Sequence, residues 1–367
     1  MLYHILYPLV EYWTGFNVFQ YITFRGIGAF ITGTVLCLIF TPKFIRQFKK
    51  HQVVESLDNS LPESHRRKAG TPTMGGIILT LTIVISSLLW NDLTNSYVLI
   101  ALLVTLWLAG LGFMDDYFKN VMHKPGGMVE KYKLGGQLVL GLLIAFALYF
   151  GYEDVNSITE ISIPFLKNVK FSLGYFFIPL VALYISFYSN AINITDGLDG
   201  LASGAIAIVA FGLGIMAYIK GHFLFSDYLQ LEFIPESGEL AIYLAALMGS
   251  ILGFLWFNVK PAEIFMGDTG ALAIGGLLAL ISILIKEEIY FIIIGGLFLI
   301  EAGSSLLQRY YFKYTKRKMG TGKRLLLCAP LHHHLEFKGW AEEKIVVRFW
   351  VITILFTAFG LITLKLR

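Results

Sequence analysis

The 367-residue sequence has few charged residues and almost no cysteine. Asp, Glu, Lys and Arg make up only 15% of it, against about 25% in an ordinary globular protein. The two cysteines, Cys37 and Cys328, are too few for a disulfide framework or a cysteine-based metal site. No internal repeat or low-complexity tract is visible either. These absences exclude disordered, fibrous and disulfide-stapled classes of protein.

Apolar residues are abundant instead. They make up 56% of the chain and include 30 Phe, 19 Tyr and 6 Trp, against an apolar share of about 45–50% in soluble domains. The mean hydropathy is +0.68. A soluble fold of this size buries only about 75% of the surface of its unfolded chain, so this amount of apolar surface excludes the soluble class. The composition predicts an all-α polytopic integral membrane protein.

Ten continuous apolar segments are near the ~20 residues that a helix needs to cross a bilayer. They predict about ten transmembrane helices in a single integral membrane domain over residues 1–367. Residues 1–21 combine tyrosines and Trp13 with polar groups, which favours an interfacial N-terminal segment. The predicted spans are 22–41, 74–90, 97–114, 134–151, 174–192, 200–219, 240–257, 270–285, 289–308 and 346–364.

The basic residues predict an orientation for these spans. One set of loops holds 21 of the 29 Lys and Arg, and the other set together with both termini holds six. The positive-inside rule therefore makes the first set cytoplasmic and both termini external. The predicted cytoplasmic loops are 42–73, 115–133, 193–199, 258–269 and 309–345.

Acidic side chains occur at the predicted cytoplasmic ends of the spans, where ionisable residues are costly and often functional. Asp115 and Lys119 are four residues apart and share a helix face, whereas Asp116 points about 100° away. Asp268 begins the span after the 258–269 loop, where it is either a helix cap or a ligand. Several carboxylates on one side favour a Mg²⁺ site, because Mg²⁺ takes carboxylates together with substrate phosphates.

Three further motifs lie on the same predicted side. Lys68 and Thr73 belong to a glycine-rich stretch that is either a phosphate cradle or a tightly packed turn. Asn190, Asn193, Asp196 and Asp199 recur at every third position and form one polar stripe, and Gly197 and Gly200 permit a break there. Three histidines follow Pro330, and contact with a phosphate or a sugar suits them better than a shared metal. They are His332, His333 and His334.

Five motifs occur in order in the predicted cytoplasmic loops: KxGTPTMGG, DDYxK, NAxNxTDGLDGLA, WFNxxPAxxFMGDxG and PLHHH. With them the chain resembles the phospho-N-acetylmuramoyl-pentapeptide transferases, within the polyprenyl-phosphate N-acetylhexosamine-1-phosphate transferase superfamily. The resemblance implies transfer of phospho-MurNAc-pentapeptide from UDP-MurNAc-pentapeptide to undecaprenyl phosphate, giving lipid I and UMP in peptidoglycan biosynthesis. It also implies a cytoplasmic active-site cleft, a Mg²⁺ cofactor, a homodimer and a place in the bacterial cytoplasmic membrane. No nucleic-acid partner is expected.

The resemblance also assigns roles to residues. It implies that Asp115, Asp116 and Asp268 are catalytic, with Asp268 the Mg²⁺ ligand. It also implies that Asn258 and Phe265 lie near the uracil, Phe265 by stacking. Glu301 marks an expected break in span nine, and the basic stretch 309–318 departs from the common pattern. The substrate-binding residues that it implies are Lys68, Thr73, Lys119, Lys131, Asn190, Asn193, Asp196, Asp199, Asn258, Phe265, His332, His333 and His334.

Other readings of the sequence differ in mechanism, substrate or class. The lipid phosphate is already largely dianionic at pH 7 because its second pKa is near 6, which favours direct attack on the sugar-linked phosphorus. A two-step path through an aspartyl nucleophile is the alternative mechanism. A UDP-GlcNAc:polyprenyl-phosphate GlcNAc-1-phosphate transferase is the alternative function. A transporter is disfavoured, because its ionisable groups would lie near the membrane midplane in an inverted repeat.

Overall fold

The computed structural model describes residues 1–51, 70–124, 126–151, 158–162 and 170–365. Most of the described chain is helical, and two short strands pair antiparallel, with Ile161 opposite Phe171. The longer elements are α2 (Ile22–Lys50), α4 (Gly76–Trp90), α5 (Ser96–Asn120), α6 (Glu130–Gly151), α8 (Phe177–Thr195), α9 (Leu201–Lys220), α11 (Ser237–Asn258), α12 (Gly267–Leu284), α14 (Gly296–Met319) and α16 (Glu342–Ile362). The shorter ones are α1 (Leu2–Leu6), β1 (Glu160–Ser162), β2 (Lys170–Ser172), α10 (Phe223–Leu229), α13 (Glu288–Ile294) and α15 (Leu331–Phe337).

The predicted class, an all-α polytopic membrane protein, is confirmed. Every predicted apolar segment overlaps a helix. Among the described residues, eight helices are long and apolar enough to cross a membrane, or nine if the bent pair α13 and α14 forms one span. The helix α4 has only 15 residues. The count of ten spans and the orientation remain predictions.

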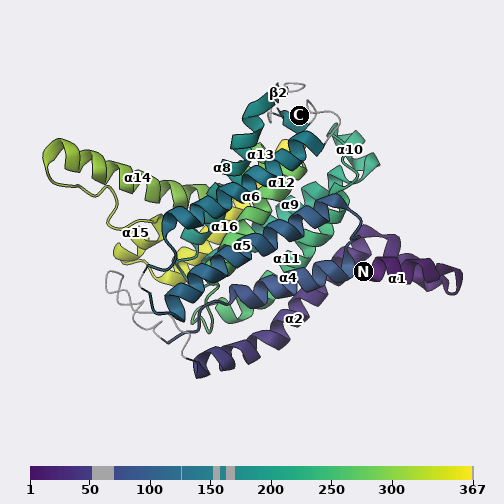
Figure 1. The fold of residues 1–367 in the computed structure, drawn as a ribbon, viewed down its shortest axis with the longest axis horizontal. Helices are drawn as coiled ribbons and strands as arrows, with labels where there is room; N and C mark the ends of the chain where they lie inside the picture. Colours follow the sequence, from purple (N-terminus) through teal and green to yellow (C-terminus); the bar gives the residue numbers. More distant parts are fainter. Residues whose placement is uncertain (52–69, 125, 152–157, 163–169, 366–367) are drawn as a thin grey trace.

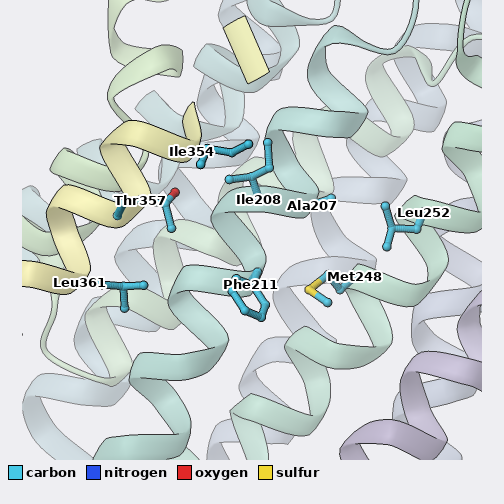
Figure 2. A pocket seen from close by; sticks show the side chains of 9 residues that line it. Ala207, Ile208, Phe211, Met248, Leu252, Ile354, Thr357 and Leu361 are labelled. Atoms are coloured by element: carbon cyan, nitrogen blue, oxygen red, sulfur yellow. The ribbon is translucent and has the colours of Figure 1, made fainter. Parts of the chain in front are cut away.

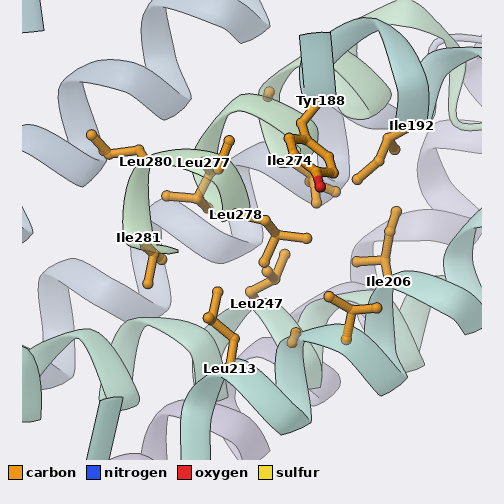
Figure 3. Close-up of a cluster of buried hydrophobic side chains, with 14 of the residues drawn as sticks. Tyr188, Ile192, Ile206, Leu213, Leu247, Ile274, Leu277, Leu278, Leu280 and Ile281 are labelled. Carbon is orange, nitrogen blue, oxygen red and sulfur yellow. The ribbon is translucent and has the colours of Figure 1, made fainter. Parts of the chain in front are cut away.

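Helix α12 is the central element of the bundle. Every residue from Asp268 to Leu284 is buried, whereas in the candidate span Ile22–Lys50 only 22% of the most apolar window is buried. Figure 3 shows leucines and isoleucines of α12 interleaved with Tyr188 of α8, Ile206 of α9 and Leu247 of α11. A helix that is apolar on every face suits this position, because neighbouring helices surround it.

Glycines bring the neighbouring helices close to the N-terminus of α12. A Cβ added at Gly112 of α5 would lie 2.3 Å from the carbonyl oxygen of Asp268, and one added at Gly76 of α4 would lie 2.0 Å from the backbone nitrogen of Gly270. No real side chain tolerates such distances. Small residues at helix contacts permit this approach in membranes, where van der Waals packing is a main source of association. The first turn of α12 is therefore held between α4 and α5.

The ends of the bundle differ. Both termini, α10 and the β-hairpin lie toward one end of the helices in Figure 1, and α15 lies toward the other. The N-terminal amine donates to the carbonyl oxygens of Leu88 and Asn91, and His4 pairs with Asp92 at 2.9 Å. The first residues are thus bound to the last turn of α4 and to the loop after it, at the end predicted to be external.

The break in the ninth predicted span is displaced from its expected place. We expected it at Glu301, but α13 ends at Ile294 and α14 begins at Gly296, with a bend of 78° between them. Glu301 lies one turn inside α14 and is fully buried. A glycine at the junction permits the bend because it has no side chain to crowd the two helices.

A groove of about 390 Å³ opens on the outside of the bundle between α9, α11 and α16. Figure 2 shows it lined by apolar side chains such as Phe211, Met248 and Leu361, with the hydroxyl of Thr357 the one side-chain polar group drawn. A groove without charged or amide side chains fits hydrocarbon. Phosphate chemistry needs polar and charged groups, so we locate the active site elsewhere.

Cysteine labelling of intact cells tests the predicted orientation. Met319 at the end of α14 and Tyr228 on α10 are 56% and 70% exposed. In a Cys328→Ser background, Met319→Cys should stay unlabelled by an impermeant maleimide, whereas Tyr228→Cys should react. Permeabilisation should expose the first site, because the 21-to-6 division of basic residues makes that side cytoplasmic. The opposite pattern would invert the topology.

Candidate active site

Two aspartates and two lysines from three helices meet near the N-terminus of α12. Lys119 Nζ lies 2.7 Å from Asp115 Oδ2 and 3.0 Å from Asp268 Oδ2. Lys133 Nζ lies 3.2 Å and 2.5 Å from the same two oxygens. Asp115 and Lys119 come from α5, Lys133 from α6 and Asp268 from α12. We call these four residues the charge cluster. It confirms that Asp115 and Lys119 share a helix face.

Asp116 has a different role from its neighbour. Its Oδ1 accepts the backbone N–H of Asp268 at 3.1 Å, and its Oδ2 accepts the N–H of Thr269 at 2.9 Å and its hydroxyl at 2.6 Å. Asp116 therefore caps α12 from a neighbouring helix, which satisfies N–H groups that a helix N-terminus leaves free. That contact makes Asp116 a positioning residue for Asp268, and its predicted catalytic role stays a prediction.

Asp268 itself does not act as a helix cap. The residue before α12 is Met266, and no side chain of the preceding segment makes a cap bond there. Gly267 has a φ of +73°, and a Cβ there would lie 2.9 Å from Asp116 Oδ2. Glycine permits this left-handed turn at no steric cost, so the chain can present the Asp268 carboxylate to the two lysines. Because the Asp268 carboxylate makes no cap bond, it can pair with the two lysines.

The segment between α5 and α6 fixes Asp115 in turn. The backbone N–H of Met128 donates to Asp115 Oδ1 at 2.6 Å. Gly127 has a φ of +62°, and a Cβ there would lie 2.4 Å from the same oxygen. One oxygen of Asp115 thus accepts a backbone bond while the other faces both ammonium groups. A carboxylate held in this way can orient a phosphate group beside it.

The polar stripe follows the end of α8, and the predicted break is confirmed. Helix α8 ends at Thr195, α9 begins at Leu201, and Gly200 has a φ of +77°. Asn190 donates to Gln137 Oε1 of α6 at 2.7 Å. The buried Asp199 accepts the N–H of Ala262 at 3.1 Å. Asn193 and Asp196 are half-buried between these two contacts.

The loop before α12 pairs with the glycine-rich stretch. The Phe265 N–H donates to the Pro72 carbonyl at 2.9 Å, and the Phe265 carbonyl accepts the Gly75 N–H at 2.8 Å. Thr73, between these contacts, is buried. A Cβ on Gly75 would lie 2.7 Å from the Phe265 carbonyl oxygen, so tight packing accounts for that glycine. Phe265 is half-buried on this loop, and its stacking on the uracil remains a prediction.

Asn258 faces into the protein. Its Oδ1 accepts the hydroxyl of Ser203 at 2.7 Å, and its Nδ2 donates to the Ile264 carbonyl at 2.9 Å. The side chain is buried and holds the loop 259–266 against α9. A contact between Asn258 and the uracil remains a prediction, and the structure gives this residue the task of shaping that loop.

The histidine triplet is divided among three environments. His332 is fully buried, its Nδ1 lies 2.9 Å from Glu301 Oε2, and a Cβ on Gly197 would lie 2.3 Å from its Nε2. It therefore joins α14 to the turn after α8. His333 Nδ1 lies 2.7 Å from Glu336 Oε2. His334 Nδ1 accepts the N–H of Leu327 at 3.1 Å. Desolvation lowers the pKa of His334, and nearby Lys338 lowers it further, so the neutral ring that this bond requires is favoured.

The lysines do not all fall where the sequence predicted. Lys68 lies outside the described residues. Lys131 is exposed with its ammonium group over the ring of Tyr132, at 5.5 Å from the centroid. The sequence offers both lysines as phosphate contacts opposite the acids and only Lys131 stands among the predicted substrate-binding residues, but Lys133 occupies the cluster. The sequence feature that could have identified Lys133 is its spacing to Gln137, because two polar residues four apart share one face of an otherwise apolar helix.

A pair of alanine variants distinguishes the two lysines. Lys133→Ala should lower turnover roughly 10²-fold, a magnitude typical of removing one preorganised charge from an active site. Lys131→Ala, two residues away on the opposite side of the helix, should stay within a few-fold of wild type. Radiolabelled UMP release from purified protein measures both. Equal decreases in turnover for the two variants would show that Lys131 also contributes to the active site.

The charge cluster suits a hard cation as well as a phosphate. Among the described residues, no three His, Cys, Asp or Glu side chains gather as a metal-binding group. However, Asp115 Oδ2 and Asp268 Oδ2 converge on the same two ammonium groups at 2.5–3.2 Å. Mg²⁺ is commonly held by one or two carboxylates, with phosphates and waters completing its six ligands. The oxygen donors present therefore fit Mg²⁺.

Comparison with known proteins shows the family to which the chain belongs. The family description "Glycosyl transferase family 4" matches residues 98–286, which span the charge cluster, and the phospho-N-acetylmuramoyl-pentapeptide-transferase signature 1 matches residues 68–78. The helical membrane fold and the cluster thus define a membrane glycosyl transferase of family 4. Within this class, the chain belongs to the phospho-N-acetylmuramoyl-pentapeptide-transferase family.

Similarity to individual relatives extends over the whole chain. The chain is 45% identical to the phospho-N-acetylmuramoyl-pentapeptide-transferase of Chloroherpeton thalassium and 46% identical to that of Chlorobium phaeobacteroides, covering 100% of each protein. It is 45% identical to that of Chlorobium luteolum, with 99% of this chain and all of the relative aligned. The family resemblance predicted from the five motifs is confirmed.

Proposed function

We propose that this chain transfers phospho-MurNAc-pentapeptide from UDP-MurNAc-pentapeptide to undecaprenyl phosphate, as a multi-pass protein of the bacterial cytoplasmic membrane. The products are lipid I and UMP. The observation that carries the proposal is the charge cluster, because it unites the DDYxK and FMGD motifs at 2.5–3.2 Å. The printed names of the relatives favour this reaction over transfer from UDP-GlcNAc.

The reaction is a substitution at phosphorus. An oxygen of the lipid phosphate attacks the sugar-linked phosphorus, and the bond between that phosphorus and the bridging oxygen breaks. The electron pair of the broken bond leaves with UMP. Because the attacking phosphate is largely dianionic at pH 7, little base catalysis is needed. The main obstacle is the approach of two anions, and positioned cations remove it.

The residues of the cluster divide this work. Lys119 and Lys133 exchange their carboxylate partners for phosphate oxygens and neutralise their charge. Asp115, held by the Met128 N–H, orients the attacking phosphate and accepts a residual proton. Asp116 keeps Asp268 in place through the first turn of α12. Phe265, half-buried on the adjoining loop, offers a ring face to the uracil.

We include Mg²⁺ in the proposal, with Asp268 as its main protein ligand and Asp115 as the neighbouring carboxylate. When bound, Mg²⁺ supplies charge neutralisation to the diphosphate and stabilises the leaving phosphate. The protein side chains still have to release these carboxylates from their lysines when substrate phosphates arrive. We also retain the homodimer as a proposal, which native mass spectrometry of the detergent-solubilised chain would test.

An assay of UMP release with two UDP-sugars tests the proposed function. Purified protein with undecaprenyl phosphate should release UMP from UDP-MurNAc-pentapeptide and not from UDP-GlcNAc. Removing divalent metal with EDTA should stop the release, and Mg²⁺ should restore it. Release of UMP from UDP-GlcNAc alone would instead support the alternative function, a UDP-GlcNAc:polyprenyl-phosphate GlcNAc-1-phosphate transferase. Release that continues in EDTA would remove Mg²⁺ from the proposal.

A further inference from the structure

Helix α14 and the segment that follows it form an extension that the proposed reaction does not use. Figure 1 shows α14 leaving the helical body sideways and ending beyond it. The 78° bend after α13 gives it this direction. We call residues 302–330 the arm. Its base lies near the buried Glu301 and Ala302.

The arm is a folded unit along one face of α14. Gln308 Oε1 accepts the N–H groups of Leu325 and Leu326, each at 2.9 Å, and its Nε2 donates to the Leu326 carbonyl at 3.1 Å. Thr315 Oγ1 accepts the N–H of Lys323 at 2.8 Å. The returning segment therefore runs back along the Gln308 and Thr315 face of the helix. The opposite face of α14 is left uncovered.

That uncovered face is apolar. Leu306, Leu307, Tyr310 and Tyr314 recur at spacings of three and four residues, so they share one side of the helix. They are between 41% and 69% exposed. An exposed stripe of leucine and tyrosine on a projecting helix is typical of a segment that rests on a membrane surface, where tyrosine takes the interfacial position.

The rest of the arm is strongly basic. Residues 302–335 contain no Asp or Glu, and no cation of the arm forms an ion pair with an acid in the part of the chain that the structure describes. The cationic residues of the arm are Arg309, Lys313, Lys316, Arg317, Lys318, Lys323 and Arg324. All seven are exposed. Uncompensated cations beside an apolar stripe are complementary to a layer of anionic headgroups over hydrocarbon.

We propose that the arm lies on the membrane and binds anionic phospholipid headgroups, with Leu306 and Leu307 against the acyl chains, Tyr310 and Tyr314 at the interface and the basic residues against the phosphates. This gives the 309–318 stretch a task independent of the transferase reaction. Each basic side chain near an anionic surface contributes roughly fivefold in binding. Neutralising four of them should therefore lower the membrane-bound population of the arm by roughly 10²–10³-fold.

A nitroxide on the arm tests this in the full-length protein. Tyr314→Cys in a Cys328→Ser background is labelled and placed in nanodiscs of phosphatidylcholine, alone or mixed with phosphatidylglycerol. With phosphatidylglycerol the label should collide with lipid-dissolved oxygen more than with an aqueous nickel chelate, and with phosphatidylcholine alone the preference should reverse. Salt near 1 M, which shortens the Debye length to about 3 Å, should also reverse it.

Two quadruple variants make the result specific. Neutralising Lys313, Lys316, Arg317 and Lys318 to Gln should abolish the response to phosphatidylglycerol. Neutralising Lys43, Arg46, Lys49 and Lys50 at the end of α2 removes equal charge from another exposed helix and should leave the response intact. Equal collision rates in both lipids, or equal effects of both variants, would overturn the proposal. A response to traces of undecaprenyl phosphate that matches the response to phosphatidylglycerol would also overturn it, in favour of acceptor capture.

Discussion

Asp268→Asn is expected to abolish turnover while the protein stays folded in the membrane. The substitution keeps the shape of the side chain and removes the charge on which Lys119 and Lys133 converge at 3.0 and 2.5 Å. It also removes the main carboxylate proposed for Mg²⁺. Loss of a single preorganised electrostatic group costs about 10²–10³-fold, and loss of the metal adds to this. We therefore expect a decrease of at least roughly 10³-fold in UMP release.

Two controls distinguish the effect of losing the Asp268 charge from an effect on the stability of the fold. Asp116, and not Asp268, caps α12, so the Asp268→Asn variant should keep the thermal unfolding temperature of wild type within a few degrees. Asp227→Asn, on the exposed part of α10, removes one charge far from the cluster and should leave turnover unchanged. Activity of the Asp268→Asn variant within a few-fold of wild type would show that this carboxylate has a structural role alone.

Asp115→Asn is expected to slow the reaction by about 10²–10⁴-fold, the usual range for losing a general base or an orienting group. Part of the loss should be recovered as the pH rises from 6 to 8. The lipid phosphate has a second pKa near 6, so a higher pH converts it to the dianion without help from the protein. The measurement is the pH profile of UMP release for both proteins. A pH-independent defect would show that Asp115 only holds the backbone at Met128.

The same residue separates the two mechanisms. If an aspartate were the covalent nucleophile, delipidated wild-type enzyme would release one equivalent of UMP from the UDP-sugar without any lipid phosphate. It would also exchange labelled UMP back into the substrate. We expect neither a burst nor exchange, because Asp115 and Asp268 are each engaged by two ammonium groups. A stoichiometric burst would establish the two-step path and leave the transferase assignment intact.

The sequence by itself determined the class of the fold and the location of most of the chemistry. Apolar runs of about 20 residues identify membrane helices because the thickness of the bilayer sets their length. The spacing of Asp115 and Lys119 predicted their contact, because four residues complete about one helical turn. The helix break at Gly197 and Gly200 could likewise be predicted from the local sequence. Each of these features depends on neighbours in the chain.

Only the tertiary structure decided which helix faces meet. Asp116 caps a helix that begins more than 150 residues later, and no local pattern indicates that partner. Lys131 and Lys133 point about 200° apart on α6, and the rotation of the helix against α5 and α12 brings Lys133 into the cluster. The bend at Gly295 likewise displaced the break expected at Glu301 and freed Glu301 to bind His332. Helical periodicity defines the faces of a helix, whereas the packing of the whole bundle determines what each face contacts.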